Sequence, residues 1–271
     1  MDDLEMMLEE MKKTIRSSMK QSNDSSQETT TTNRCSKCNG TGWQFIDYNT
    51  VVECDCGLIE KQRMESKLQF AMIPTTYKDV RLEDISTKFY RQQTSKDVIK
   101  AISRSIAWYL DNLYENIEEG KGLYLWSDTK GSGKTMMAAA IANELINKYR
   151  RYVKFATSLD ILDEIKATYN SREENGESKL LKDLVSAEFL VIDDFGTERA
   201  TDWAGEKFYQ IVNKRYMNQK VTFFTSNFDL RELKYDDRIT NRIRERSFII
   251  HFPEESVREF KAKLDDKRLG V

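Results

Sequence analysis

A short glycine-rich segment between two apolar segments constrains the fold of this chain more than any other feature. The segment Gly131–Thr135, with the sequence Gly-Ser-Gly-Lys-Thr, follows the apolar run Leu123–Trp126 and precedes a stretch rich in alanine. A strand, a glycine-rich loop and a helix in this order gather backbone N–H groups and the positive end of a helix dipole around one point, where phosphate groups bind. The order therefore predicts a nucleotide-binding loop, and a chance match in an ordinary turn is the less favoured alternative.

Two side chains of this loop have defined tasks in nucleotide binding. A lysine here reaches the β- and γ-phosphates and the hydroxyl after it holds Mg²⁺, which assigns these tasks to Lys134 and Thr135. Asp128 stands where the full pattern has a glycine, and a carboxylate near phosphates is repulsive unless it points away. We expect ATP and Mg²⁺ as cofactors. The residues expected to contact the nucleotide are Thr129, Lys130, Gly131, Ser132, Gly133, Lys134, Thr135 and Met136.

A second apolar run ends in two acidic residues. Phe189–Ile192 reads as a buried strand, and Asp193 and Asp194 follow it directly. Asp193 is expected to hold the Mg²⁺ shell and Asp194 to polarise the attacking water. Adjacent carboxylates in this position are also common as helix N-caps, so Asp194 has a structural alternative. The presence of both motifs in this order favours the catalytic interpretation.

Two further candidates follow the later apolar runs. Asn227 comes after Val221–Thr225, at a strand end that faces the crevice where α/β sheets bind ligands, so it could orient the water or sense the γ-phosphate. A turn residue is the alternative. Arg238, Arg242 and Arg246 share one helical face. The residues alone favour a solvated face with acidic partners over an arginine that reaches the phosphate of a neighbouring subunit.

Apolar runs of strand length alternate with helical segments over most of the chain. This alternation is typical of βαβ units, and it predicts an α/β fold whose parallel sheet is covered by helices on both faces. The predicted strands are Leu123–Trp126, Tyr152–Ala156, Phe189–Ile192, Val221–Thr225 and Phe248–Phe252. The predicted helices between them are 134–149, 158–169, 202–218 and 229–245.

All 4 cysteines lie in one short segment. They are paired as Cys35-x₂-Cys38 and Cys54-x-Cys56, and four thiolates suit tetrahedral Zn²⁺, with four free thiols as the alternative. No apolar run approaches the roughly 20 residues that span a bilayer. The N-terminus is acidic where a signal peptide would be basic. We therefore expect a soluble cytoplasmic protein, in which a cysteine cluster indicates a metal site rather than disulfides.

The N-terminal segment carries an amphipathic pattern. Leu4, Leu8, Met11 and Ile15 form one apolar stripe on a helix, and a polar run follows them. We expect this helix to dock on another protein; the alternatives are that it folds back on the chain or pairs with its own copy. The expected domains are 1–33 (helix and linker), 34–62 (zinc module), 63–91 (connecting segment) and 92–271 (ATPase domain).

Together these motifs resemble those of the AAA+ ATPases of the DnaC/DnaI helicase-loader group, with the IstB transposition ATPases as relatives. The residues that carry the resemblance are Ile73, Pro74, Tyr77, Gly131–Thr135, Ala140–Leu145, Val191–Gly196, Thr225–Asn227 and Arg238–Ile243. The resemblance implies a five-stranded parallel sheet of order 5-1-4-3-2, an arginine finger acting in trans at Arg242 and a phosphate sensor acting in cis at Arg258. The cysteine module resembles the N-terminal zinc domain of Gram-positive and phage loaders.

This resemblance also implies a function. The protein would hydrolyse ATP, associate with its own copies through the ATP site, and deliver a hexameric DnaB-type replicative helicase onto single-stranded DNA during replication initiation, with no membrane partner. Since 43 Lys+Arg stand against 45 Asp+Glu, any DNA contact must be a local patch rather than a uniformly basic surface. Two alternatives stay open: an IstB-like helper of transposition, and a zinc-bearing adaptor whose ATPase fold does not hydrolyse.

Overall fold

The structure, a computed structural model, divides the chain into two compact units, residues 1–65 and 66–271. The residues that it describes are 35–47, 50–170, 176–198 and 201–269. The amphipathic stripe predicted near the N-terminus lies outside the described residues. Among the described helices, none has the length and apolar character needed to cross a membrane.

The first unit contains a small antiparallel hairpin between the two cysteine pairs. Its strands are β1 (Trp43–Phe45) and β2 (Val51–Glu53), and Trp43 is opposite Glu53 in the register. Helix α2 (Leu58–Ala71) begins directly after the second cysteine pair. Strands this short bury little apolar surface, so the hairpin needs a further source of stability.

The second unit is built on a five-stranded sheet in which every neighbouring pair of strands is parallel. Its order is β4-β5-β6-β3-β7. If β3 to β7 are numbered 1 to 5 and the sheet is read from the β7 edge, this is the order 5-1-4-3-2. The order implied by the resemblance is therefore confirmed. The strands are β3 (Gly122–Trp126), β4 (Val153–Thr157), β5 (Phe189–Phe195), β6 (Val221–Ser226) and β7 (Ser247–His251).

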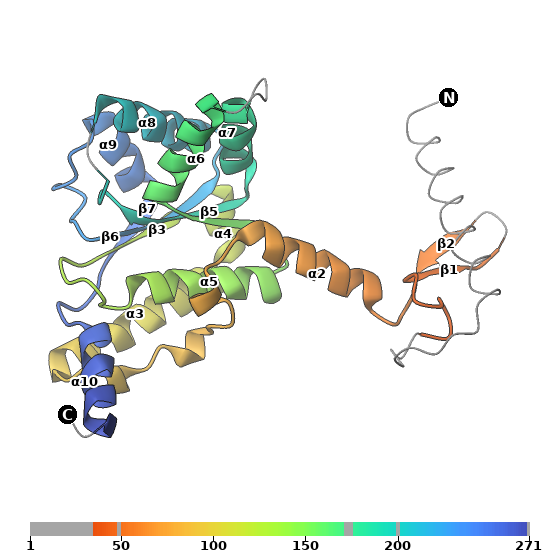
Figure 1. The fold of residues 1–271 in the computed structure, drawn as a ribbon, viewed down its shortest axis with the longest axis horizontal. Helices are drawn as coiled ribbons and strands as arrows, with labels where there is room; N and C mark the ends of the chain where they lie inside the picture. Colours follow the sequence, from red (N-terminus) through yellow and green to blue (C-terminus); the bar gives the residue numbers. More distant parts are fainter. Residues whose placement is uncertain (1–34, 48–49, 171–175, 199–200, 270–271) are drawn as a thin grey trace. The chain divides into compact units, whose positions relative to one another are not determined.

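Helices cover both faces of this sheet, as predicted (Figure 1). One face packs against α6 (Ser158–Asn170), α7 (Gly176–Ser186), α8 (Asp202–Met217) and α9 (Asp237–Glu245). The other face carries α3 (Gln93–Asp111) and α5 (Lys134–Asn147), and the fully buried alanines Ala138–Ala140 let α5 approach the strands closely. The remaining helices are α4 (Leu113–Glu118), α10 (Val257–Leu269) and the 3₁₀ turns η1 (Thr75–Tyr77), η2 (Leu82–Asp84) and η3 (Thr87–Phe89).

The helix predicted over 229–245 is shorter than expected. It begins at Asp237, because the Asp236 carboxylate accepts a hydrogen bond of 2.7 Å from the Arg238 backbone N–H and so caps the helix there. Upstream, the Asp229 carboxylate accepts a hydrogen bond of 2.9 Å from the Arg231 backbone N–H, and this bond stabilises a turn in place of a helix. Aspartate at both positions therefore decides where the helix starts.

A buried arginine ties the helices to the sheet. Arg215 on α8 is only 1% exposed, and burial lowers the pKa of its guanidinium to about 9. The guanidinium donates to neutral oxygens at 2.5–2.9 Å, which are the carbonyls of Leu184, Ala187 and Val221 and the hydroxyl of Thr222. Because Leu184 lies in the last turn of α7, the charge also meets the negative end of that helix dipole.

Replacing Arg215 with methionine is expected to lower the free energy of unfolding by about 3–5 kcal/mol, because the buried acceptors lose their donors together. Urea denaturation followed by circular dichroism measures this. The neighbouring exposed Lys214→Met exchange is the matched control, with an expected change within about 0.5 kcal/mol. Equal stability of the two variants would show that the Arg215 hydrogen bonds contribute little.

Candidate functional site

The predicted glycine-rich loop connects the carboxyl end of β3 to the first residue of α5, and two of its positions require glycine. Gly131 has φ +79° and Gly133 has φ +103°, both in the left-handed region that favours glycine. A Cβ atom on Gly131 would lie 2.9 Å from the Arg258 Cβ, and one on Gly133 would lie 3.0 Å from the Tyr90 hydroxyl. Close neighbours and backbone conformation therefore both exclude larger residues.

Lys134 points into this loop rather than into solvent. Its side chain is 5% exposed, and Nζ donates to the carbonyls of Ser127 and Thr129 at 3.1 Å and to the Ser132 hydroxyl at 3.3 Å. Burial lowers the pKa of Lys134, while nearby carboxylates, Asp194 foremost, oppose this. The loop thus holds an ammonium group at its centre, where phosphate oxygens would bind.

Asp193 lies beside the first turn of α5, where two hydroxyl groups meet it. The Thr225 hydroxyl donates to Asp193 Oδ1 at 2.5 Å, and the Thr135 hydroxyl also hydrogen-bonds this carboxylate. Burial raises the pKa of Asp193 to about 6. A hydroxyl and a carboxylate side by side are hard oxygen ligands, so Thr135 and Asp193 fit the Mg²⁺ predicted for them.

Asp194 takes a different orientation from its neighbour. It adopts φ +54°, and its backbone N–H donates to the Thr225 hydroxyl at 3.0 Å. The alternative that Asp194 is a helix N-cap is wrong, because the next helix, α8, is capped by Thr201, whose hydroxyl accepts from the Ala204 N–H. Asp194 instead lines a pocket.

This pocket has a volume of about 530 Å³ and lies over the glycine-rich loop. It gathers predicted residues from the loop, from Asp194 after β5, from Asn227 after β6 and from Arg258 on α10. Thr129 does not line it and contributes a carbonyl to Lys134 instead. The lining residues are Thr76, Tyr77, Lys130–Met136, Asp194, Thr197, Asn227, Val257, Arg258 and Lys261.

Several lining residues come from segments that the loop motif does not predict. Thr76, Val257 and Lys261 had no signal in the sequence pattern. Tyr77 was among the residues that carried the family resemblance, but had no assigned task there. These residues form walls from the segment before α3 and from α10, on either side of the loop in sequence.

The Asp128 side chain does not line the pocket, although its charge is among those that act to raise the pKa of Lys134. Asp128 is exposed, and its backbone N–H donates to Glu254 Oε1 at 3.1 Å. The same carboxylate of Glu254 accepts from the Thr129 N–H at 2.8 Å and meets the His251 ring nitrogen at 2.7 Å. Although burial opposes it, these hydrogen bonds lower the pKa of Glu254 to about 2. The His251 ring also stacks on Trp126, with 4.0 Å between the ring centres.

Arg242 does not line the pocket of its own chain within the described residues. It is half-buried on α9, where its guanidinium carbon lies 5.3 Å from the Tyr209 ring centre and 5.5 Å from that of Tyr216. Its Nη1 donates to the Arg238 carbonyl at 2.7 Å, while Arg238 itself pairs with Asp236. The predicted acidic partners are thus present for Arg238 and for Arg246, whose Nε lies 4.0 Å from Glu245, whereas Arg242 stacks on the two tyrosines.

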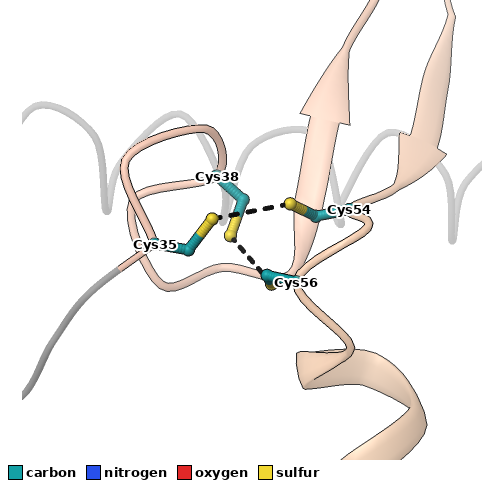
Figure 2. A group of neighbouring side chains, drawn as sticks. All are labelled: Cys35, Cys38, Cys54 and Cys56. Atoms are coloured by element: carbon teal, nitrogen blue, oxygen red, sulfur yellow. Dashed lines mark hydrogen bonds between the residues drawn. The ribbon is translucent and has the colours of Figure 1, made fainter.

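The cysteines come together in the first unit (Figure 2). The sulfur atoms of Cys35, Cys38, Cys54 and Cys56 all lie within 4.8 Å of one another. The Cys35–Cys54 and Cys38–Cys56 sulfur pairs are 3.7 Å apart. A tetrahedral site with Zn–S bonds of about 2.3 Å places its sulfur atoms about 3.8 Å apart. Both the donor set and its spacing therefore fit Zn²⁺.

One buried amide holds the pocket wall that Thr76 and Tyr77 form. Asn143 on α5 is 4% exposed, and its Nδ2 donates to the Tyr77 carbonyl at 2.9 Å and the Val80 carbonyl at 2.8 Å. Its Oδ1 is buried without a hydrogen-bond partner among the described residues. The amide group therefore links the helix that begins at Lys134 to the opposite wall of the pocket.

Replacing Asn143 with aspartate is expected to weaken nucleotide binding roughly tenfold. The carboxylate has the same shape as the amide, but it cannot donate hydrogen bonds and would repel the carbonyl oxygens of Tyr77 and Val80. Titration calorimetry with a non-hydrolysable ATP analogue measures this. The same exchange at the exposed Asn147, one turn along α5, is the control and should leave the affinity unchanged. An unchanged affinity for Asn143→Asp would show that the wall does not depend on this amide.

The fold and the pocket define a P-loop ATP-binding protein of the AAA+ type. The family described as "IstB-like ATP binding protein" matches residues 28–263, and the chain belongs to this family. The likeness to replicative helicase loaders is also confirmed: DnaI of Bacillus subtilis (strain 168) is 29% identical over 179 residues, 65% of this chain and 55% of DnaI. DnaC of Escherichia coli (strain K12) is 30% identical over 45% of this chain and 49% of DnaC. The chain thus matches about half the length of these curated relatives.

Solved structures of helicase loaders are also similar to this chain. The crystal structure of the DnaC helicase loader matches with a TM-score of 0.56 and 25% identity, over 66% of this chain and 99% of that one. The crystal structure of DnaI matches with a TM-score of 0.56 and 28% identity, over 71% and 99%. The fold alone is shared with AMPPCP-bound DnaA from Aquifex aeolicus, at a TM-score of 0.53 and 16% identity, over 74% of this chain and 57% of that one.

Proposed function

We propose that this protein is an ATP-hydrolysing helicase loader that delivers a hexameric DnaB-type helicase onto single-stranded DNA in the cytoplasm. The observation that carries the proposal is the pocket over the glycine-rich loop. It combines Lys134, Asp194 and Asn227 in a fold shared with proteins named as replicative helicase loaders. An ATP-dependent switch on such a fold suits a protein that must hold a partner and then release it.

Different residues of the pocket would bind the phosphates, hold the metal ion and activate the attacking water. Lys134 and the loop N–H groups would hold the β- and γ-phosphates, and Arg258 would contact them from α10. Mg²⁺ held by Thr135 and Asp193 would neutralise charge on the phosphate oxygens. Asp194 would accept hydrogen bonds from the attacking water, and Asn227 would orient that water or respond to the γ-phosphate. The water-polarising group and the phosphate-binding lysine thus line the same pocket.

We further propose that Arg242 acts on the pocket of a neighbouring copy, since it lies away from its own. Mixing Arg242→Ala and Lys134→Ala chains in equal amounts should then restore about a quarter of the wild-type ATPase rate, because random assembly gives that share of interfaces both groups. Each variant alone should be inactive. No recovery at any mixing ratio would favour action in cis. Arg244→Ala, on the same helix and exposed, is the control and should stay active.

The cysteine module completes the proposal. We propose that it binds one Zn²⁺ and, with the segment 1–33, docks on the helicase. The division into 34–62 as zinc module, 63–91 as connecting segment and 92–271 as ATPase domain belongs to this proposal. Support comes from the four converging sulfur atoms and from the likeness to DnaI.

A loading assay tests the proposed function directly. The helicase of the source organism is incubated with circular single-stranded DNA coated with single-strand-binding protein, and the helicase retained on the circle is measured. Retention should require both this protein and ATP. Capture of a transposase and assembly on duplex DNA would instead support a transposition helper, which the IstB-like family match keeps as a second candidate. Absence of ATP turnover would support a non-hydrolysing adaptor.

A further inference from the structure

The backbone of Asp194 is held by hydroxyl groups from three segments. Its N–H donates to the Thr225 hydroxyl on β6, at 3.0 Å. Its carbonyl accepts from the Ser158 hydroxyl at 3.0 Å and from the Thr197 hydroxyl at 2.8 Å. These contacts hold Asp194 at a φ of +54°, in the left-handed region that non-glycine residues adopt infrequently and aspartate more often than most. The backbone that carries the Asp194 carboxylate is therefore held in part by Ser158 and Thr225, which do not line the pocket.

One of these hydroxyls contacts a buried glutamate that has no task in the site described above. Ser158 is the first residue of α6, is fully buried, and has its Oγ 2.5 Å from Glu198 Oε2. Glu198 is 7% exposed, does not line the pocket, and accepts from the Gly196 N–H at 3.2 Å. Burial raises the pKa of Glu198, which favours its protonated form.

The proton count at Ser158 decides how these groups are connected. A hydroxyl carries one proton, so Ser158 cannot donate to Asp194 and to Glu198 at once. If Glu198 holds a proton, it donates to the Ser158 oxygen, and Ser158 donates to the Asp194 carbonyl. If Glu198 is ionised, Ser158 turns to it, and the Asp194 carbonyl loses that donor. Only the first arrangement satisfies both contacts.

We propose that Glu198 is a positioning residue for ATP hydrolysis, which acts through Ser158 to hold Asp194 with its carboxylate towards the pocket. The inference rests on the proposed function, in which Asp194 polarises the attacking water. The chain of hydrogen bonds joins the start of α6, directly after β4, to the turn after β5. It places a buried glutamate behind the catalytic carboxylate, so hydrolysis depends on a group that touches neither nucleotide nor water.

A set of variants of the full chain tests this proposal. Ser158→Ala should lower kcat at least about tenfold, because the Asp194 carboxylate loses its fixed position. The affinity for ATP should stay unchanged, because the glycine-rich loop is not involved. Glu198→Ala should also lower kcat, because the Ser158 hydroxyl loses the carboxyl group that orients it. Glu198→Gln should keep kcat within about twofold of wild type, since its amide can donate to Ser158 and accept from Gly196.

Further measurements separate this role from a structural one. If Glu198 only stabilises the turn, Glu198→Ala will lower the melting temperature while Ser158→Ala and Glu198→Gln keep wild-type kcat and KM, and the proposal is overturned. Equal loss of kcat in Glu198→Gln and Glu198→Ala would also overturn it. The variant Asp194→Asn separates a failure of the role proposed for Asp194 from a failure of the positioning role proposed for Glu198. If that variant hydrolyses ATP normally, the assigned role of Asp194 fails; if it is inactive while Ser158→Ala is active, only the positioning role fails.

Discussion

Replacing Lys134 with alanine is expected to abolish ATP turnover, with a loss of at least about 100-fold in kcat/KM. The reason is the position of its ammonium group, which the Ser127 and Thr129 carbonyls hold inside the glycine-rich loop, where it would meet the phosphates. A coupled assay of ADP release measures the effect. Lys148→Ala, at the C-cap of the same helix, is the control, because Lys148 is exposed and its neighbours are Glu144 and Tyr149, away from the loop.

The companion variant Asp194→Asn should separate binding from chemistry. Its amide keeps the shape of the side chain but removes the charge that is proposed to polarise the water, so hydrolysis should slow much more than ATP binding weakens. Lys134→Ala, in contrast, should impair both. Turnover close to wild type in Lys134→Ala would mean that ATP is hydrolysed elsewhere, and equal loss of binding in both variants would contradict the separate roles.

Removal of zinc is expected to unfold the cysteine module while leaving the ATP-binding unit folded. The hairpin strands Trp43–Phe45 and Val51–Glu53 are too short to be stable alone, and structural Zn²⁺ contributes about 10–16 kcal/mol in comparable sites. Elemental analysis should find one zinc per chain. A chelator, or the exchange Cys38→Ser, should make residues 35–65 sensitive to protease.

Nucleotide affinity provides the internal control for this experiment, since the pocket residues all lie in the second unit and should bind ATP equally well without zinc. Lys37→Ala, next to a ligand but not one itself, should keep full zinc content. Less than about half an equivalent of zinc after purification in metal-replete medium would contradict the metal site.

Local patterns in the sequence predicted the sheet and the loop well, because both depend on neighbouring residues. The run Phe189–Ile192 is fully buried in a strand, and Gly131 and Gly133 adopt the positive φ angles that a phosphate-binding loop requires. The order of the strands, however, came from the family resemblance. Apolar runs alone do not encode which strands are neighbours.

The remaining features depend on contacts between distant segments. The repulsion expected from Asp128 could not be judged, because its backbone N–H is bound by Glu254, far along the chain. The hydrogen bonds from Asn143 to the Tyr77–Val80 turn are likewise invisible in a linear pattern. The start of α9 at Asp237 was mispredicted because apolar periodicity continues upstream of the aspartate cap.

The last helix of the chain has a consequence for any shortened form of the protein. Helix α10 begins against the glycine-rich loop, where the Val257 N–H donates to the Gly131 carbonyl at 2.9 Å and Arg258 lies against the same glycine. Among the residues expected to contact the nucleotide, only Arg258 lies on this helix, through the family resemblance, and the loop and strand motifs that end at Asn227 give no reason to keep it. A chain that stops before Val257 would nevertheless lose one wall of the pocket and the hydrogen bond that holds Gly131, so the smallest complete ATP-binding unit extends through α10.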